Sequence, residues 1–224
     1  RYDNGFKEFE EPVLQPLHQI FNKDSILELD GKNNPKEPDW PETDFIIGNP
    51  PFLGNRKIRP ILGETYVNNL QKVYKNDLDG IPDLVCYWFN KAEKLLERGK
   101  VKRVGLLATQ AIRGGTNRQV LDRIVKNGEI FMAWSDKEWI LDGAKVHVSI
   151  VGFDKGGNKN IYLNGNSVKS INSHLDSEND LSSAQTLIEN ENLSFQGVVL
   201  RGKFDITQEE AKEMLKRKNP SGKL

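Results

Sequence analysis

A short apolar run that ends in an asparagine and two prolines limits the fold of this chain more than any other feature. The run Asp44-Phe-Ile-Ile-Gly48 has the length and composition of a strand that is buried on both faces of a sheet, and Asn49-Pro50-Pro51-Phe52 follows it directly. In open α/β sheets, ligands bind at the carboxyl ends of the strands. The sequence therefore predicts a sheet protein with a binding site immediately after residue 48.

The four residues after this strand suit a planar base that carries an exocyclic amine. Two prolines fix two φ angles and remove two N–H donors, so the loop is stiff and its carbonyl oxygens are free to accept hydrogen bonds. The side-chain oxygen of Asn49 and the carbonyl of Pro50 can accept both amine hydrogens while Phe52 stacks on the ring. Stacking contributes roughly 1–3 kcal/mol per base, which offsets the cost of turning a base out of a duplex. The alternative is a rigid surface turn that binds nothing.

Strand and helix patterns alternate along the rest of the chain, and this order predicts an α/β domain with a largely parallel sheet and an antiparallel pair near its end. Residues 1–22 are expected to be helical in part, and residues 32–41 and 52–80 to be irregular. Further strands are expected at 25–29, 104–108, 130–134, 145–153, 161–163 and 195–200. Helices are expected at 82–98, from Thr116 or Asn117 to about residue 126, and at 209–216.

The low counts of cysteine and histidine exclude a disulfide-stapled module and argue against a metal site or a catalytic triad. The single cysteine, Cys86, cannot form an internal disulfide, and its apolar surroundings predict a buried, unreactive thiol. His18, His147 and His174 lack the spacing of a metal site or a catalytic triad, so no metal is expected. No apolar run approaches the ~20 residues that span a bilayer.

Charge is distributed unevenly although the formal net charge is zero. Residues 1–50 carry 5 basic and 11 acidic side chains, whereas residues 51–127 carry 15 basic and 7 acidic ones. A locally basic segment can form a surface that faces phosphates. Solvated helix faces explain the same charges equally well.

The order of motifs resembles that of the S-adenosylmethionine-dependent DNA methyltransferases that act on adenine N6. The resemblance is strongest to large bacterial single-chain enzymes of restriction–modification and phage defence, and it covers about residues 18–220. It implies a Rossmann-like class I methyltransferase sheet that ends in an antiparallel hairpin, in a bacterial cytoplasmic protein. After Asp44–Phe52, the matching motifs are Ile81-Pro-Asp-Leu-Val-Cys-Tyr-Trp-Phe-Asn-Lys-Ala92, Arg103-Val-Gly-Leu-Leu-Ala-Thr-Gln-Ala-Ile-Arg-Gly-Gly115, Trp134-Ser-Asp and Val146-His-Val-Ser-Ile-Val-Gly-Phe153.

The resemblance also implies roles for individual residues toward the target base and the cofactor, S-adenosylmethionine. Asn49 and Pro50 would hold the amine and Phe52 would stack on the adenine, with Pro51 completing the catalytic loop. Asp24 is the candidate for the acid that contacts the cofactor adenine, and Asp30 is its competitor. The expected cofactor-binding residues are Asp24, Asn49 and Asp83.

Further residues are expected to contact double-stranded DNA that carries a flipped adenine. They are Arg56, Lys57, Arg59, Arg113, Arg118 and Trp139. Residues 114–118, at a predicted helix start, could bind a phosphate through their backbone N–H groups, and a plain turn is the alternative. Trp139 is expected against the second face of the flipped base. Ile140 and Leu141 align nearly as well, and a core position for the tryptophan stays open.

Two parts of the family pattern are missing from this sequence, namely the glycine-rich cofactor loop and the target-recognition domain. We therefore expect a central fragment, in which residues 1–155 belong to the catalytic domain and residues 156–224 open a connecting or target-recognition subdomain. By itself it is expected to bind S-adenosylmethionine poorly and to be inactive. Without the strand that carries the cofactor loop, residues 44–48 would form an open apolar edge, and the isolated chain is expected to self-associate through it.

Three functions stay open from the sequence. The first is the catalytic portion of a site-specific adenine-N6 DNA methyltransferase in restriction–modification or phage defence. The second keeps the methyl transfer but places an RNA base or a protein glutamine amide in the amine pocket. The third is a non-catalytic module that flips or clamps DNA bases. The length of the resemblance, through Phe153 and beyond, favours the first.

Overall fold

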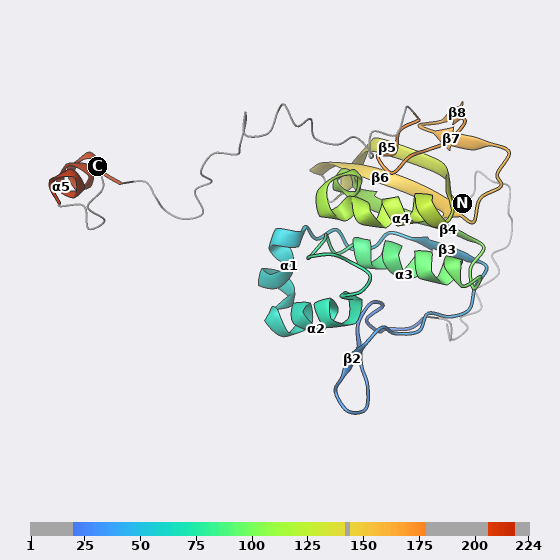
Figure 1. Cartoon of the computed structure of the whole chain (residues 1–224), viewed down its shortest axis with the longest axis horizontal. Helices are drawn as coiled ribbons and strands as arrows, with labels where there is room; N and C mark the ends of the chain where they lie inside the picture. The colour runs from blue at the N-terminus through green and yellow to red at the C-terminus, as the bar shows by residue number, and fades with distance from the viewer. Residues whose placement is uncertain (1–19, 142–143, 178–205, 218–224) are drawn as a thin grey trace, which may run out of the picture. The chain divides into compact units, whose positions relative to one another are not determined.

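A mixed six-stranded sheet forms the centre of the first of two units (Figure 1). The computed structural model describes residues 20–141, 144–177 and 206–217, and the chain divides into units of residues 1–182 and 183–224. The strand order is β3-β4-β6-β5-β7-β8. The strands are β3 (Phe45–Gly48), β4 (Arg103–Thr109), β5 (Glu129–Leu141), β6 (Ala144–Asp154), β7 (Ile161–Leu163) and β8 (Asn166–Val168).

The directions of these strands confirm the α/β class and the closing hairpin but correct the topology. β3 pairs with β4, and β5 with β7, in parallel. The pairs β4–β6, β5–β6 and β7–β8 are antiparallel. The expectation of a largely parallel sheet is therefore wrong. Only two residues separate β5 from β6, so these strands must run in opposite directions, and β6 inserts between β4 and β5.

Two helices occupy most of residues 52–80, which the sequence predicted to be irregular. The prediction of an irregular segment is therefore wrong. The helices are α1 (Asn55–Leu62) and α2 (Glu64–Tyr74). Ile58 of α1 and Val67 and Leu70 of α2 are buried. These apolar positions are spaced for one helix face, but the surrounding basic residues and Pro60, which lies inside α1, obscure the pattern in the sequence.

The next two helices begin later than the sequence indicates. α3 (Cys86–Glu97) starts four residues after Pro82, and in the turn before it the backbone N–H of Leu84 donates to the carbonyl of Leu53 at 2.9 Å. α4 (Gln119–Asn127) follows the 3₁₀ turns η2 (Gln110–Arg113) and η3 (Gly115–Arg118). Asn117 caps neither turn nor helix; its side chain accepts a hydrogen bond from Asp83 instead.

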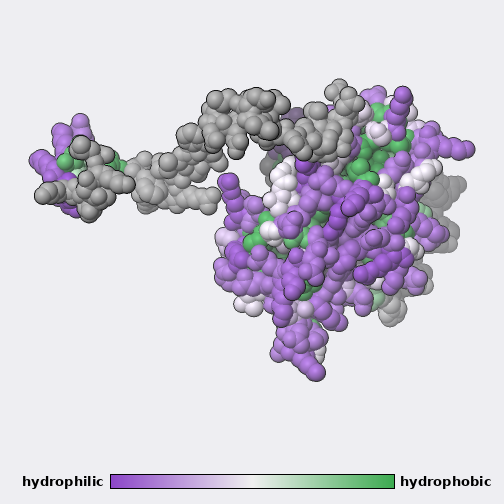
Figure 2. Space-filling model, in the orientation of Figure 1, coloured by the Kyte–Doolittle hydropathy of each residue, from purple (hydrophilic) through white to green (hydrophobic). Residues whose placement is uncertain are grey.

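The core lies between the sheet and the layer formed by α3 and α4, which pack side by side (Figure 1). Alternate residues of β4, namely Val104, Leu106 and Ala108, are buried in this core, as strand geometry requires. Phe153 of β6 stacks on Phe89 of α3 with ring centroids 6.1 Å apart. Hydrophilic residues dominate the surface over the helices in Figure 2, and hydrophobic ones gather where β5 and β7 lie. Within the described residues, no helix combines the length and apolar character that crossing a membrane requires.

β3 forms one edge of the sheet and exposes apolar side chains. Ile47 is 88% exposed and Phe45 is 58% exposed, whereas Ile46 packs against the core. Because Phe45 and Ile47 are exposed on one face, the expectation that this strand is buried on both faces is wrong for the present chain, and among the described residues β3 pairs with β4 alone. The open apolar edge expected from the missing neighbour is present.

We predict that the 224-residue chain self-associates through the β3 edge. Unpaired backbone groups beside exposed apolar side chains tend to pair with another strand. Light scattering should give a mass above that of one chain, and the mass should fall toward one chain in Ile47→Lys, because charge opposes edge pairing. Ile140→Lys, which places the same charge on another exposed isoleucine, is the matched control. A monodisperse monomer at all concentrations would contradict the prediction.

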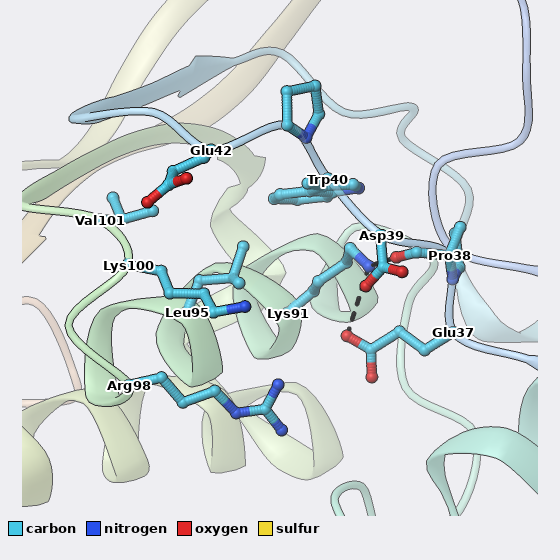
Figure 3. A pocket seen from close by; sticks show the side chains of 11 residues that line it. Glu37, Pro38, Asp39, Trp40, Glu42, Lys91, Leu95, Arg98, Lys100 and Val101 are labelled. Atoms are coloured by element: carbon cyan, nitrogen blue, oxygen red, sulfur yellow. Dashed lines mark hydrogen bonds and ion pairs between the residues drawn. The ribbon is translucent and has the colours of Figure 1, made fainter.

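The segment that enters β3 is fastened to α3 by Trp40 and Lys91, which we call the Trp40–Lys91 latch (Figure 3). Lys91 Nζ lies 5.0 Å from the centroid of the Trp40 ring and donates to the carbonyl of Pro38 and the carboxylate of Glu37. Trp40 Nε1 donates to the carbonyl of Ser25 at 2.7 Å. Burial lowers the pKa of Lys91, and Glu37 opposes this shift. The adjoining pocket of about 240 Å³ thus lies at the amino end of β3, away from the predicted catalytic loop.

The remaining elements are small. β1 (Glu28–Leu29) and β2 (Pro35–Lys36) form a hairpin, so the strand expected at 25–29 is shorter than predicted and residues 32–41 are not entirely irregular. In the second unit, α5 (Gln208–Lys216) confirms the expected helix and begins with a capping box between Thr207 and Glu210. The strand expected at 195–200, and residues 1–19 of the expected N-terminal helix, lie outside the described residues.

Candidate active site

The predicted catalytic loop, Asn49–Phe52, leaves the carboxyl end of β3. Because β3 and β4 are parallel, the loop lies at the same edge of the sheet as the turn after Thr109. Pro50 is buried, Asn49 is exposed and Phe52 is half-buried. Phe52 and the first turns of α1 line an open hollow of about 480 Å³. The local sequence produces this arrangement because the prolines bar the strand from continuing.

The polar groups of the loop are available to a ligand. Within residues 20–141, 144–177 and 206–217, neither the Asn49 side chain nor the Pro50 carbonyl has a hydrogen-bond partner. The amide oxygen and the carbonyl oxygen are both acceptors. With the half-buried ring of Phe52, they are the groups that the sequence predicted to bind an aromatic amine, and this role stays a prediction.

Asp24 is a pre-oriented acceptor. Its Oδ1 accepts the backbone N–H groups of Ile26 at 2.9 Å and Leu27 at 3.0 Å, and its Oδ2 accepts the hydroxyl of Tyr66 at 2.7 Å. A carboxylate offers about four acceptor positions, so Oδ2 retains one for a ligand. Burial, and then this hydrogen bond, raise the pKa of Tyr66, which keeps the hydroxyl a donor.

Asp30, the competitor of Asp24, closes the turn between β1 and β2. Its Oδ1 accepts the backbone N–H groups of Lys32 and Asn34, each at 2.8 Å, and its Oδ2 accepts the Asn34 side chain at 3.2 Å. These bonds, those from Asn34 first, lower the pKa of Asp30. Asp30 Oδ2 thus retains one acceptor position, as Asp24 Oδ2 does, and Asp24 stays the predicted cofactor contact on the sequence resemblance alone.

Asp83 connects the catalytic loop to the turns after β4. Its Oδ1 accepts the backbone N–H of Asn55 at 2.8 Å, and the neighbouring Leu84 N–H donates to Leu53. The backbone N–H of Asp83 in turn donates to Asn117 Oδ1 at 2.8 Å. We call Asp83, Asn117 and these bonds the Asp83–Asn117 clamp.

The three basic residues that follow the loop differ in their surroundings. Arg56 and Lys57 are exposed on α1. The guanidinium of Arg59 donates to the side chains of Glu64, Asn68 and Gln71, the last two at 3.0 and 2.9 Å. Arg59 thus joins α1 to α2, and of the described residues that line the hollow, Arg56 and Lys57 are the charged ones.

Arg113 and Arg118 flank the turn after β4, at the same edge as Asn49. Arg113 lies 3.8 Å from Asp136 and Arg118 lies 3.4 Å from Asp122, and both guanidinium groups stay partly exposed. Gly115 has φ +54°, a conformation that favours glycine and opens the turn. Arg118 Nη1 also lies 2.8 Å from His174 Nε2, and Arg113 contacts Gln110 at 3.4 Å, so Arg118 is the more firmly held of the two.

Trp139 lies on the part of the β5–β6 hairpin that projects beyond the sheet. β4 ends opposite Val148, so residues 137–141 and 144–147 extend past its carboxyl end. Trp139 is 40% exposed and Ile140 is 72% exposed. A core position for Trp139, which the sequence left open, is therefore wrong. The side chain of Leu141 is outside the described ones.

Cys86 is buried, as predicted, and burial raises the pKa of its thiol, so this side chain is unreactive. Among the residues that the structure describes, no group of three histidine, cysteine or acidic side chains is arranged to hold a metal ion.

Tyr66 and Asn117 each form a hydrogen bond with a predicted site residue, and neither bond could be predicted from the sequence. Tyr66 binds Asp24 across 42 positions of the chain, and Asn117 binds Asp83 across 34. Periodicity and local motifs carry no information on such pairs, because they depend on how α2 and η3 pack. Only the structure reveals them.

An α/β sheet with an Asn-Pro-Pro-Phe loop at the carboxyl end of a strand, and a hairpin that projects beyond the sheet, is the arrangement expected of an amino-group methyltransferase. The profile of the family described as MmeI, DNA-methyltransferase domain, matches residues 13–163, and the chain belongs to this family. The resemblance to methyltransferases of restriction–modification systems is thereby confirmed.

Comparison with solved structures gives a match to the Type IIL restriction–modification enzyme MmeI in complex with DNA. The two sequences are 26% identical over 61% of this chain and 20% of that one, with a TM-score of 0.49. The chain therefore spans about one fifth of the length of that enzyme. No curated protein sequence matches it.

Proposed function

We propose that the chain is the catalytic portion of a site-specific DNA methyltransferase that acts on the N6 amine of a flipped adenine in restriction–modification or phage defence. The observation that carries this proposal is the exposed Asn49 amide, which has no partner among the described residues and lies at the carboxyl end of β3, near Phe52 in the sequence. Membership in the MmeI DNA-methyltransferase family supports DNA as the substrate. The choice of adenine rests on the order of the sequence motifs, which resembles that of the adenine-N6 enzymes, because the acceptors of the loop suit an exocyclic amine in general.

The residues of this chain fit S-adenosylmethionine in part. The remaining acceptor position on Asp24 Oδ2 suits the cofactor adenine, and Asp83 and Asn49 lie at the same edge of the sheet. When bound, the cofactor supplies a methyl group on a sulfonium. Among the described residues, no strand pairs with the open edge of β3, so none of them encloses the expected cofactor on that side. We therefore propose that the cofactor-loop strands of a Rossmann-like class I sheet come from another part of the full-length gene product.

The catalytic loop acts on the amine by orienting it. The Asn49 oxygen and the Pro50 carbonyl accept the two amine hydrogens, and Phe52 stacks on the base. Accepting both hydrogens would draw the nitrogen toward tetrahedral geometry and localise its lone pair, making it a nucleophile toward the methyl group that the bound cofactor would supply, with the sulfonium sulfur as the leaving group. The surplus proton leaves to water after transfer. No general base is required, so orientation supplies the rate enhancement.

The basic residues and the hairpin are proposed to hold the DNA around this loop. Arg56 and Lys57 would neutralise phosphates beside the flipped base, and Arg113 and Arg118 would do so at the turn after β4. Trp139 would pack on the base from the projecting hairpin. Residues 156–224 are proposed to lead toward the part that reads the sequence.

Methyl transfer by the full-length gene product tests the proposed function directly. Tritiated S-adenosylmethionine is incubated with unmodified plasmid DNA, and the DNA is digested to nucleosides. We expect the label in N6-methyladenine. Label in another nucleoside would overturn the adenine assignment. Bound cofactor without labelled DNA would favour an RNA or protein amide, and absence of cofactor binding would favour a DNA clamp.

A further inference from the structure

We propose that Asn117 is a positioning residue that holds the catalytic loop Asn49–Phe52 in its reactive geometry through Asp83. This inference rests on the function proposed above. It assigns to Asn117 a role in the reaction although its side chain touches neither the loop nor the hollow, and it links the turn after β4 to the loop after β3.

The segment of residues 77–83 is held by three side chains from η3 and α4. Gln119 binds the backbone of Asp79 twice, with its Oε1 2.7 Å from the amide nitrogen and its Nε2 3.1 Å from the carbonyl oxygen. Arg123 donates to the carbonyl of Asp77 at 2.6 Å. Asn117 Oδ1 accepts the N–H of Asp83 at 2.8 Å. All three side chains hold residues 77–83 in place, but they differ in whether the residue they bind makes a further bond to the catalytic loop.

Only the bond from Asn117 continues to the catalytic loop. It reaches Asp83, whose Oδ1 accepts the N–H of Asn55 at 2.8 Å. At its other end, the Asn117 side chain donates to the carbonyl of Ala111 at 3.3 Å, within η2. Two side chains in series, those of Asn117 and Asp83, therefore join the turn that carries Arg113 to the residues that follow Phe52.

The catalytic loop is a stiff segment between two flexible glycines. Pro50 and Pro51 remove two rotations from it, and Gly48 and Gly54, the most permissive residues, lie on either side. The orientation of Asn49 and Phe52 therefore depends on where the loop is fastened beyond Phe52. The fastening points are the Leu53 carbonyl and the Asn55 N–H, which Leu84 and Asp83 bind. Misplacing a reactive group by about 1 Å can cost roughly 10²-fold in rate.

Kinetics of the full-length gene product test this role with Asn117→Ala, and Gln119→Ala serves as the matched control. Both variants remove hydrogen bonds between the η3–α4 region and residues 77–83, but only the first acts on Asp83. We expect Asn117→Ala to lower kcat by about 10- to 100-fold, with the KM for S-adenosylmethionine changing less than about threefold. Gln119→Ala should leave kcat within about threefold of wild type, since it removes bonds worth about 1 kcal/mol each from a site remote from the loop.

Hydrogen exchange provides a readout that does not depend on activity. The Asn55 N–H is protected by Asp83, so Asn117→Ala should speed exchange in the peptide of residues 49–57 by about tenfold, the loss expected for one hydrogen bond. Gln119→Ala should leave that peptide unchanged. Asn117→Ser, which is too short to reach both Asp83 and Ala111, is the second variant if the alanine variant does not fold, with the same expected results.

The outcomes separate this inference from the proposed function. A gene product that methylates no DNA adenine refutes the function, while faster exchange of residues 49–57 still supports the clamp. Methylation with equal kcat and equal exchange in the Asn117 and Gln119 variants overturns the positioning role. A fall in kcat without faster exchange in that peptide overturns it as well.

Discussion

Replacing Asn49 with alanine in the full-length gene product should lower the rate of methyl transfer by about 10²- to 10³-fold, the loss typical of removing one pre-oriented hydrogen-bonding group at a reacting centre. The Asn49 amide has no partner among the described residues and is exposed at the carboxyl end of β3, so no internal bond compensates for it. The substitution removes one of the two acceptors that orient the amine. Initial rates of tritium transfer to DNA measure the effect.

Asn160→Ala is the matched control for this experiment. Asn160 is also an exposed asparagine, but it precedes β7, which runs parallel to β5 and hence in the direction of β4. The start of β7 therefore lies at the edge of the sheet opposite to Asn49, and this variant should retain the wild-type rate. An Asn49→Ala rate within about threefold of wild type would refute the assigned role, because even a single net hydrogen bond is worth about 1 kcal/mol.

The largest effect on stability is expected from Gly128→Ala. Gly128 ends α4 immediately before β5, and a Cβ atom there would overlap the carbonyl oxygen of Asp154, with which Glu129 pairs. The Cβ atom is fixed by the backbone of residue 128 and the oxygen belongs to the backbone of Asp154, so relief requires the first β5–β6 pair to separate. We expect a loss of about 3 kcal/mol, the upper range for overpacking, and a fall in Tm of about 6–12 °C. Urea unfolding of the chain followed by circular dichroism measures the change.

Gly105→Ala provides the comparison within the same sheet. Gly105 lies in the middle of β4, and a Cβ atom there would meet no heavy atom within 4 Å. Its effect should stay within about 0.5 kcal/mol, as for substitutions that disturb no contact. Equal losses in the two variants would show that the contact with Asp154 is not the cause.

The parts of the fold that could be predicted are those encoded in short apolar runs. Residues 44–48 and 104–108 and the alternation of Val146, Val148 and Ile150 each indicate a strand, because burial within a sheet requires such patterns. α1 and α2 could not be read from the sequence, since one narrow apolar stripe lies among charged residues and a proline. The exposure of Ile47 also could not be read from its own segment. It depends on which neighbouring strand is present.

The candidate site likewise has a part that could be predicted from the sequence and a part that could not. Asn49–Phe52 are contiguous, and the stiffness and acceptor chemistry of such a loop are properties of its sequence. The partners of Asp24, Asp83 and Arg59 come from other elements, and nothing in the local sequence distinguishes an aspartate that is held by a tyrosine from one that closes a turn. The bonds between distant segments decide which charged residues are free for a ligand.

The two fastenings described for β3 also determine its register. A four-residue strand with a single neighbour can slip by one position, and such a slip would turn Ile47 toward the core and Ile46 outward. It would also carry Asn49 to the opposite face of the sheet. Lys91, which holds the entry to β3, belongs to α3, and Asp83, which holds the exit, lies three residues before that helix. The distance between Lys91 and Asp83, which belong to one helix and the turn before it, thus fixes the register of β3 and with it the position of Asn49.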